Sequence, residues 1–448
     1  MSSSERYRQH LETLDRQLAD ALERAGRAGV ALEGVLFHAG RAELYHADDE
    51  PVTFRATPHF RRWVPLPGPE HAVLARPGRR PLVVRVQPRD FWYDTSPPPR
   101  SYWEDSVDLQ EVESFSDLPK VTGPLPRVAY VGNSAAAAGE AGIPAQRIEP
   151  APLLAPLDWH RAAKTPHEVA LIEFACRKAA DGHRSARQAF EQGGSEREIH
   201  WAYLQGSDQV EGENPFSTIV ALDEKAAILH YQGKRGGEAA PGRVLLLDAG
   251  AAFSGYAADV TRTWVRPAAD SSFRALLEGL DALERDLVAM VAPGRPYPEI
   301  HLEAHRLVAD LLVAVGIVKG SAQEAVERRV TRAFFPHGVG HLLGIQVHEV
   351  GGRQASPEGG ELPPPDDHVL RNTRTLEPGH VVTIEPGIYF IPMLLGPLRE
   401  GEAAHLVDWS LVDLLMPYGG ARIEDDVLCT DSGPRDLTRP KLEGPRGV

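Results

Sequence analysis

The most informative stretch of the chain is LLLDAGAAFSGYAADVTRTW, residues 245–264. Its first three residues have the apolar pattern of a buried strand, which ends on the carboxylate of Asp248. A glycine-rich turn follows, and the chain returns through small residues to Asp259. As a hairpin, this stretch brings Asp248 and Asp259 onto neighbouring strands. Two carboxylates beside apolar neighbours cost free energy unless they are neutralised, although a single Asp is more often a turn or N-cap residue.

Three later segments carry further polar groups in apolar surroundings. FFPHGVGHLLGIQVHEVGG (residues 334–352) contains His337, His341 and His348 among glycines and apolar residues. VVTIEPGIYF (residues 381–390) ends an apolar strand on Glu385, and GGARIEDDVL (residues 419–428) contains Glu424. A neutral imidazole beside glycine backbone is a candidate ligand or proton carrier.

These groups together indicate a metal site. Four carboxylates and one imidazole supply mainly hard oxygen donors, which suit Mn²⁺ or Co²⁺ better than a sulfur-rich zinc site would. The four carboxylates carry four negative charges, which two divalent ions would offset. The candidate ligands are Asp248, Asp259, His341, Glu385 and Glu424.

Outward from these motifs, the chain divides into two predicted domains. Residues 1–158 form a small mixed α/β domain, with a helix over 4–28 and strands at 32–37, 72–75, 81–86 and 127–131. The Pro- and Ala-rich stretch 143–156 is predicted to be the segment where the chain leaves this domain. Residues 159–448 form an α+β domain, which begins with a capping box at Thr165–Glu168. Its other predicted helices are 195–206, 272–291 and 297–315, and its strands are 217–222, 244–248, 256–265, 380–384 and 421–427.

Composition excludes several classes of protein. The chain has 448 residues, of which 42% are apolar and 25% charged, as in ordinary globular domains. Its net charge of −15 makes nucleic acid and anionic lipid poor partners. The polar N-terminus lacks the apolar core of a signal peptide, and we find no run long enough to span a membrane. With only Cys176 and Cys429, a disulfide framework is excluded, and we expect a reducing cytoplasm.

The ordered motifs resemble those of the pita-bread metallopeptidase family, in particular its bacterial Xaa-Pro dipeptidase (prolidase) type. Besides the segments above, IVALDEKAAILHYQGK (219–234) and LEPGHVVTIEPGIYFI (376–391) carry the resemblance. It extends into the first domain through HFRRWVPLPGPEHAV (59–73) and FWYD (91–94). The resemblance therefore covers nearly the whole chain and implies a C-terminal pita-bread domain behind a smaller creatinase-like α/β domain.

The resemblance implies a two-metal centre, most often manganese, with Co²⁺ or Zn²⁺ as alternatives. Asp248 would chelate one ion, His341 and Glu385 would hold the other, and Asp259 and Glu424 would bridge both. A water or hydroxide between the ions would be the nucleophile that cleaves an Xaa-Pro dipeptide and releases proline.

Further residues match the family in substrate roles. Glu385 would accept the proton and return it to the proline nitrogen. His348 and His230 would hydrogen-bond the substrate carbonyl and the developing oxyanion. Arg371 and Arg399 would clamp the free carboxylate, where a bidentate donor is preferred. Tyr231 would line the pocket or merely pack.

The resemblance also implies a homodimer. An N-terminal loop of one subunit, at Asp48 and Asp49, would complete the other subunit's pocket. Alternative functions are an aminopeptidase for longer Xaa-Pro peptides, an organophosphate-hydrolysing relative, and a pita-bread module that binds without catalysis. The chain lacks GxSxG, so the nucleophile elbow of the α/β-hydrolases is missing.

Overall fold

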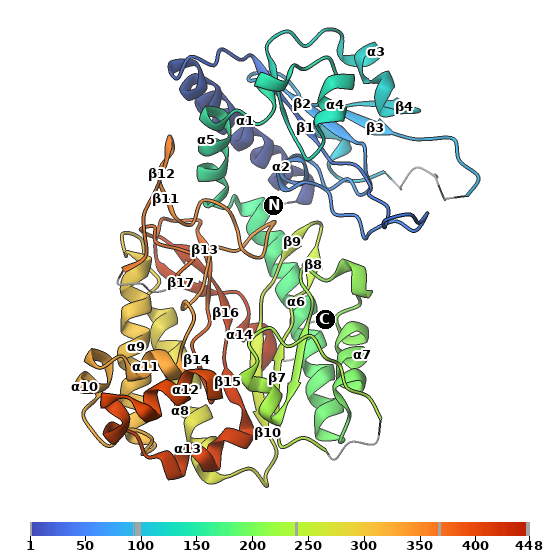
Figure 1. Cartoon of the computed structure of the whole chain (residues 1–448). Helices are drawn as coiled ribbons and strands as arrows, with labels where there is room; N and C mark the ends of the chain where they lie inside the picture. Colours follow the sequence, from blue (N-terminus) through green and yellow to red (C-terminus); the bar gives the residue numbers. More distant parts are fainter. Residues whose placement is uncertain (1, 93, 95–99, 238–240, 366–368, 445–448) are drawn as a thin grey trace. The chain divides into compact units, whose positions relative to one another are not determined.

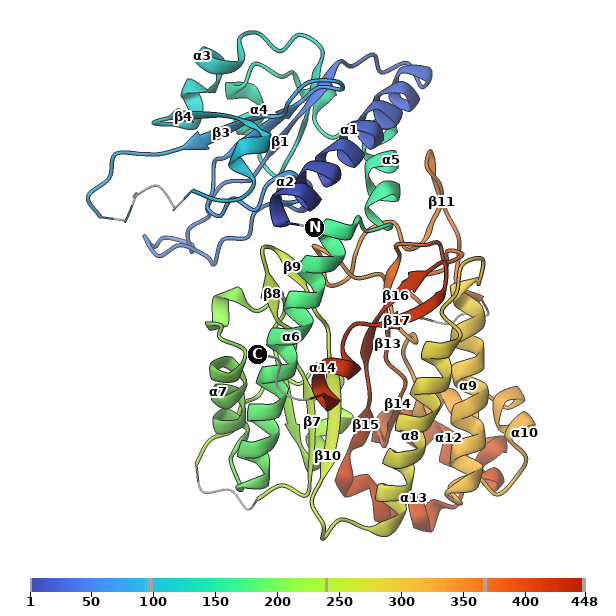
Figure 2. The same ribbon diagram turned by 180° about the vertical axis from the view of Figure 1, so that it is seen from behind.

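A computed structural model describes residues 2–92, 94, 100–237, 241–365 and 369–444. The chain forms two compact units, drawn from opposite sides in Figures 1 and 2. The first unit contains the chain up to Arg161 with Thr165–Val169 and Gln354–Gly360, and the second contains Ala162–Lys164, Ala170–Arg353 and the chain from Glu361 onward. Among the described helices, none combines the length and apolar character needed to cross a bilayer.

The first unit is built on a five-stranded mixed sheet with the strand order β4-β3-β2-β1-β5. Strand β1 pairs parallel with β5, and β3 pairs parallel with β4, while β2 is antiparallel to both its neighbours. Every residue of β1, β2 and β5 is buried, which explains their mainly apolar sequences. The elements are α1 (Ser3–Arg27), β1 (Gly34–His38), α2 (Pro58–Trp63), β2 (Ala72–Ala75), β3 (Leu82–Val86), β4 (Asp108–Val112), α3 (Leu118–Thr122), β5 (Val128–Val131), α4 (Ala135–Glu140) and α5 (Ala151–Arg161).

Several elements of this unit were not predicted, among them the short helices α2, α3 and α4. Strand β4 was not predicted, because the polar sequence DLQEV lies at the edge of the sheet and is largely exposed. The stretch 143–156, predicted to end the domain, leads into helix α5, and the predicted boundary at residue 158 lies inside that helix, close to Arg161, where the main segment of the first unit ends. Helix α5 tolerates Pro156 because Leu153 and Leu157 pack into the core of the unit.

The second unit is α+β, as predicted. In Figures 1 and 2, helices α6 and α7 lie on one side of its strands, and α8 and α9 lie on the other. The strands form the ladders β10-β7-β6, β13-β16-β17 and β14-β15. Apolar side chains of α6 and α7 pack against β6 and β7, while those of α8 and α9 pack against β13, β14 and β16. This packing holds the strand ends that carry the candidate ligands.

The predicted helices and strands of this unit have bounds close to those expected, and the unit also contains short helices and strands that were not predicted. The helices are α6 (Pro166–Glu191), α7 (Glu196–Gly206), α8 (Ser271–Ala289), α9 (Tyr297–Ala314), α10 (Ala322–Glu327), α11 (Val330–Phe334), α12 (Pro392–Glu400), α13 (Trp409–Leu415) and α14 (Arg439–Glu443). The strands are β6 (Ile219–Leu222), β7 (Val244–Asp248), β8 (Ala252–Phe253), β9 (Tyr256–Ala257), β10 (Thr261–Val265), β11 (Gln354–Ser356), β12 (Gly359–Glu361), β13 (Val381–Ile384), β14 (Gly387–Tyr389), β15 (Gly420–Arg422), β16 (Asp425–Thr430) and β17 (Gly433–Asp436). Helix α6 begins with the predicted capping box: the Thr165 and Glu168 side chains each accept the other's backbone N–H.

Two predicted strands are interrupted in the structure. The expected strand 256–265 is divided into β9 and β10, and 421–427 is divided into β15 and β16. A third interruption separates β13 from β14. The three breaks contain Asp259, Glu424 and Glu385, so the chain leaves its ladder at each of these three candidate ligands.

Candidate metal centre

Strand pairing brings the acidic candidates together. Thr261 on β10 pairs with Asp248 at the end of β7 and also forms a bridge with Glu424. Strand β13 pairs with β16, and β14 pairs with β15, so the breaks that hold Glu385 and Glu424 face each other. Residues separated by more than 170 positions therefore converge because their strands are neighbours.

His341 joins this group from a loop that requires glycine. A Cβ atom at Gly340 would collide with the carbonyl oxygen of Thr383, so only glycine fits there. The backbone N–H of His341 donates to Oγ1 of Thr383 at 3.0 Å. Its Nε2 atom then lies 3.4 Å from Oδ2 of Asp259 and 3.6 Å from Oε1 of Glu385.

The donor atoms are close enough to share a cation. One atom from each of Asp259, His341 and Glu424 lies within 4.8 Å of the other two, and all three residues are buried. Asp248 accepts a hydrogen bond from Arg422 on Oδ2 at 2.6 Å. Its other oxygen, Oδ1, is buried without a hydrogen-bond partner in the described part of the chain. A buried carboxylate oxygen without a donor is an atom that a bound cation would satisfy.

The electrostatics also favour a cation. Burial raises the pKa of Asp248, although Arg422 opposes the shift. Burial and the neighbouring acids raise the pKa values of Asp259 and Glu424 well above their usual range. Burial raises the pKa of Glu385 to about 7. Because like charges are crowded in a desolvated site, divalent cations would stabilise the ionised carboxylates. The residues present therefore fit a divalent-metal site built from oxygen donors and one imidazole.

A series of hydrogen bonds through Arg422 and Thr261 connects the carboxylates of Asp248 and Glu424. Arg422 donates through Nε to Oγ1 of Thr261 at 3.0 Å and through Nη1 to the hydroxyl of Tyr389 at 2.8 Å. Thr261 in turn donates to Oε2 of Glu424 at 2.5 Å. The Tyr389 hydroxyl also lies 2.9 Å from Nε2 of His337.

Thr261, Thr383 and Tyr389 were not among the site residues predicted from the sequence motifs. Thr261 lies two residues after Asp259, and Thr383 lies two residues before Glu385. Residues at this spacing share a face of an extended chain, so the alternation could have identified both threonines. Tyr389 offers no comparable signal, because its contact with Arg422 depends on the pairing of β14 with β15.

Three predicted substrate residues lie around the donor group. The imidazoles of His341 and His348 are in edge-on contact, with centroids 4.5 Å apart. Burial, followed by the nearby His341, Arg371 and His230, lowers the pKa of His348 to about 3. His348 is nevertheless only partly enclosed, and His230, His348 and Arg371 all keep solvent-accessible surface, as groups that meet a substrate must.

Two other predicted substrate residues have partners of their own. The hydroxyl of Tyr231 donates to buried Glu196 at 2.9 Å. Arg399 on α12 donates to Asp413 at 2.6 Å, and its guanidinium lies over the ring of Trp409 at 4.7 Å. The structure therefore accounts for both side chains without a substrate contact.

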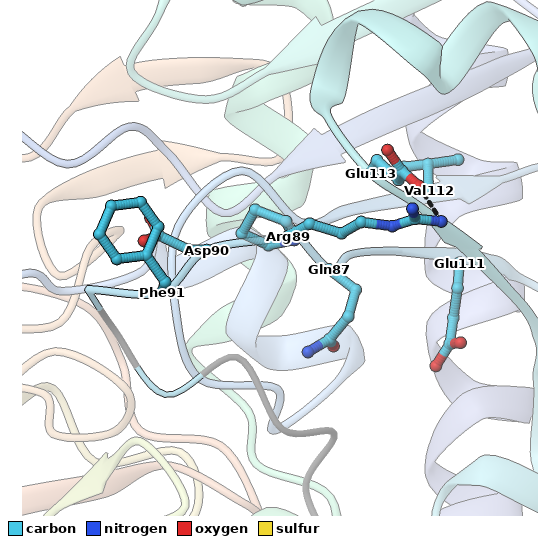
Figure 3. A pocket seen from close by; sticks show the side chains of 8 residues that line it. Gln87, Arg89, Asp90, Phe91, Glu111, Val112 and Glu113 are labelled. Atoms are coloured by element: carbon cyan, nitrogen blue, oxygen red, sulfur yellow. Dashed lines mark ion pairs between the residues drawn. The ribbon is translucent and has the colours of Figure 1, made fainter.

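A separate pocket of about 700 Å³ lies in the first unit, at the ends of β3 and β4 (Figure 3). Arg89 extends across it to an ion pair with Glu113 at 2.9 Å. The lining residues are Gln87, Pro88, Arg89, Asp90, Phe91, Glu111, Val112 and Glu113. This pocket contains none of the converging donors described above, so we base the function on the buried donor group.

Comparison with known proteins agrees with this geometry. Residues 170–431 match the family described as Metallopeptidase family M24, and residues 5–159 match the Xaa-Pro dipeptidase N-terminal domain. The chain therefore belongs to metallopeptidase family M24, whose members are hydrolases.

Relatives that match the chain over nearly its full length carry the name Xaa-Pro dipeptidase. The chain is 40% identical to a protein of Stenotrophomonas maltophilia named Xaa-Pro dipeptidase, over 98% of both chains. A protein of the same name from Xanthomonas campestris is also 40% identical, again over 98% of both.

Solved structures support the pita-bread fold. Pseudomonas aeruginosa aminopeptidase PepP has a TM-score of 0.70 at 22% identity, covering 100% of this chain and 96% of that one. Zinc-substituted Escherichia coli aminopeptidase P has a TM-score of 0.71 at 23% identity, covering 96% and 94%. These likenesses concern the fold alone.

Proposed function

We propose that this protein hydrolyses Xaa-Pro dipeptides at a centre of two divalent metal ions. The observation that carries the proposal is the buried donor group, in which crowded carboxylates and one imidazole converge from separate strands. The name Xaa-Pro dipeptidase of the full-length relatives supports the substrate class. Mn²⁺ is the proposed metal, because the donors are mainly carboxylate oxygens, and Co²⁺ or Zn²⁺ are the alternatives.

In this proposal, Asp248, Asp259, His341, Glu385 and Glu424 would hold the two ions, with Asp259 and Glu424 shared between them. Such an ion pair supplies two effects when bound: it lowers the pKa of a shared water and it polarises the scissile carbonyl. Arg422 keeps one oxygen of Asp248 occupied, so the other oxygen remains for metal binding.

The remaining roles belong to protein side chains. Glu385 accepts the proton of the attacking water and returns it to the leaving proline nitrogen. His230 and His348 donate hydrogen bonds to the substrate carbonyl oxygen as it gains negative charge. Arg371 binds the terminal carboxylate of the dipeptide, which a longer peptide would lack at that position. We assign no such role to Arg399, because Asp413 and Trp409 engage its guanidinium.

The test compares substrates on one preparation loaded with Mn²⁺ and analysed for metal content. An Xaa-Pro dipeptide should be cleaved far better than the matching Xaa-Pro-Yaa tripeptide. Equal or better cleavage of the tripeptide would reject the carboxylate clamp and favour an aminopeptidase. Absence of Xaa-Pro cleavage by fully metal-loaded protein would leave a binding module or an organophosphate hydrolase, which a phosphotriester substrate would identify.

We also propose that the protein is a homodimer in a reducing cytoplasm. Both cysteines are free and buried, which supports a reducing environment. Asp48 and Asp49 lie in an exposed segment of the first unit, which supports a role in completing the partner's pocket. Sedimentation should give twice the chain mass of 48.9 kDa.

Subunit mixing tests the loop directly. A protein with Asp48→Ala and Asp49→Ala, mixed with a Glu385→Gln protein, should regain activity in mixed dimers, because one site then has an intact loop and an intact Glu385. Mixtures that stay inactive after verified subunit exchange would refute completion in trans.

A further inference from the structure

Asp426 is a buried carboxylate next to the donor group that the mechanism above does not use. It lies on β16, two residues after Glu424, and its side chain is fully buried. Its Oδ2 atom accepts the backbone N–H of Asp259 at 3.1 Å and the Sγ–H of Cys176 at 3.3 Å. Its own backbone N–H donates to Oγ1 of Thr438 at 3.0 Å. The carboxylate is therefore directed at the backbone of a candidate ligand.

The backbone of Asp259 needs such an acceptor. Asp259 lies in the break between β9 and β10, where the chain leaves its ladder. A buried N–H without an acceptor is costly, and here a side chain supplies what a strand partner would otherwise provide. The acceptor belongs to the strand segment that follows Glu424. Asp426 therefore connects the strand segment that follows Glu424 to the backbone of Asp259.

We propose that Asp426 is a positioning residue of the metal centre, which fixes the distance between the carboxylates of Asp259 and Glu424 by holding the backbone of Asp259. This inference rests on the proposed two-metal function. Ligand–metal distances must stay within about 0.2 Å of their preferred values. A movement of the Asp259 backbone in the break between β9 and β10 would therefore weaken metal binding. The orientation of ligands by residues behind them typically changes metal affinity by about 10- to 100-fold.

A matched pair of substitutions isolates the acceptor. Asp426→Asn and Asp426→Leu give side chains of similar shape, but only Asn keeps an oxygen that can accept the Asp259 N–H. Mn²⁺ affinity is measured by calorimetric titration of metal-free protein, beside the kinetics of Xaa-Pro cleavage. Asp426→Leu should bind Mn²⁺ about 10-fold or more weakly and lose kcat with little change in KM. Asp426→Asn should retain most of the affinity and activity.

A merely structural role predicts a different pattern. Cys176→Ala removes the other donor to the same oxygen without touching Asp259, and it should leave Mn²⁺ affinity unchanged whatever it does to thermal stability. Wild-type Mn²⁺ affinity in Asp426→Leu would overturn the proposal, and so would an equal loss in Asn and Leu. If the Leu protein does not fold, Asp426→Ala replaces it, and a large loss of affinity in folded Asp426→Asn still refutes the acceptor role.

The wild-type titration separates this proposal from the proposed function. If wild-type protein binds no Mn²⁺ or cleaves no Xaa-Pro dipeptide, the proposed function fails. If wild-type protein does both and Asp426→Leu behaves identically, only the inference about Asp426 fails.

Discussion

The two carboxylate oxygens of Asp248 differ in their surroundings, and only one of them is open to the proposed metal ion. Arg422 donates to one oxygen at 2.6 Å, while the other is buried without a donor in the described residues. Through Thr261, the same guanidinium is connected to Glu424. One cation of the protein therefore offsets part of the charge of the acidic group before any metal binds, and the unfilled oxygen remains for the metal.

Asp259→Asn should remove metal as well as activity. The substitution preserves shape but deletes one negative charge and one anionic donor from a site where Asp259, His341 and Glu424 share a small volume. Elemental analysis after dialysis against limiting Mn²⁺ should show about 10-fold weaker retention. The control is Asp310→Asn on the exposed face of α9, which should retain metal normally. Normal metal content in Asp259→Asn would refute its bridging role.

Arg371→Ala and Arg399→Ala should separate the two predicted clamp residues. Arg371 lies near His341 and His348, whereas Asp413 and Trp409 engage Arg399. Loss of a charge-assisted hydrogen bond should raise the KM for a dipeptide roughly 10-fold in Arg371→Ala, with kcat nearly unchanged if ground and transition states are bound alike.

Arg399→Ala should keep the wild-type KM. The same initial-rate measurements decide both variants. A KM increase confined to Arg399→Ala would reverse the assignment, and an unchanged KM in both variants would remove the clamp from the mechanism.

At the scale of elements, sequence periodicity was sufficient for the long helices α1 and α6–α9 and for most strands, but not for the helices α2–α5 and α10–α14 or for two of the strand breaks. The apolar runs at 72–75 and 244–248 correspond to β2 and β7, and the capping box starts α6 where predicted. The end of a strand at Glu385 was predicted, but the breaks at Asp259 and Glu424 were not, because local pattern does not say where a strand changes partner. The candidate metal ligands could nevertheless be proposed from the sequence, since each acidic residue stands out against an apolar strand.

Helix α14 depends on Arg439, which neutralises acids that β16 and α8 bury. Its guanidinium contacts Glu284 at 2.5 Å and Asp425 at 2.9 Å, and both acids are fully buried. Arg439→Met should lower the free energy of unfolding by roughly 3–5 kcal/mol, because it removes the cation that contacts buried Glu284, although Asp425 keeps its ion pair with Arg262 at 2.6 Å. Urea unfolding measures the difference.

Arg435→Met is the matched control on the neighbouring strand β17. Arg435 pairs with Glu173 at 3.1 Å, but both side chains are substantially exposed. Its loss should therefore cost only about 0–1 kcal/mol. Equal destabilisation by the two substitutions would show that burial of the Arg439 cluster does not determine its contribution.

At the scale of the whole molecule, both units bury neutral histidines. Burial lowers the pKa values of His38, His183 and His380 to about 3 and that of His71 to about 4. His38 and His71 belong to the first unit, and His183 and His380 belong to the second. Unfolding exposes these rings to water, where they bind protons near pH 6.5. Acid should therefore destabilise both units.

His38 allows this pH dependence to be measured for one group. Its Nδ1 atom lies 2.7 Å from the hydroxyl of Tyr130, and burial, Arg41 and His71 all disfavour its protonated form. The folded state does not bind the proton until about pH 3, whereas the unfolded state binds it below about pH 6.5. The contribution of His38 to stability is thus intact above pH 6.5 and is lost progressively as the pH falls towards 3.

Between pH 7.5 and 5.0, wild-type protein should therefore lose about 2 kcal/mol more unfolding free energy than His38→Gln, as measured by urea unfolding at both pH values. The control is His46→Gln at an exposed position of the same unit, which should lose as much as wild type. Identical pH dependence in the two variants would mean that the buried ring of His38 is already protonated in the folded state at pH 5, contrary to the effect of its burial.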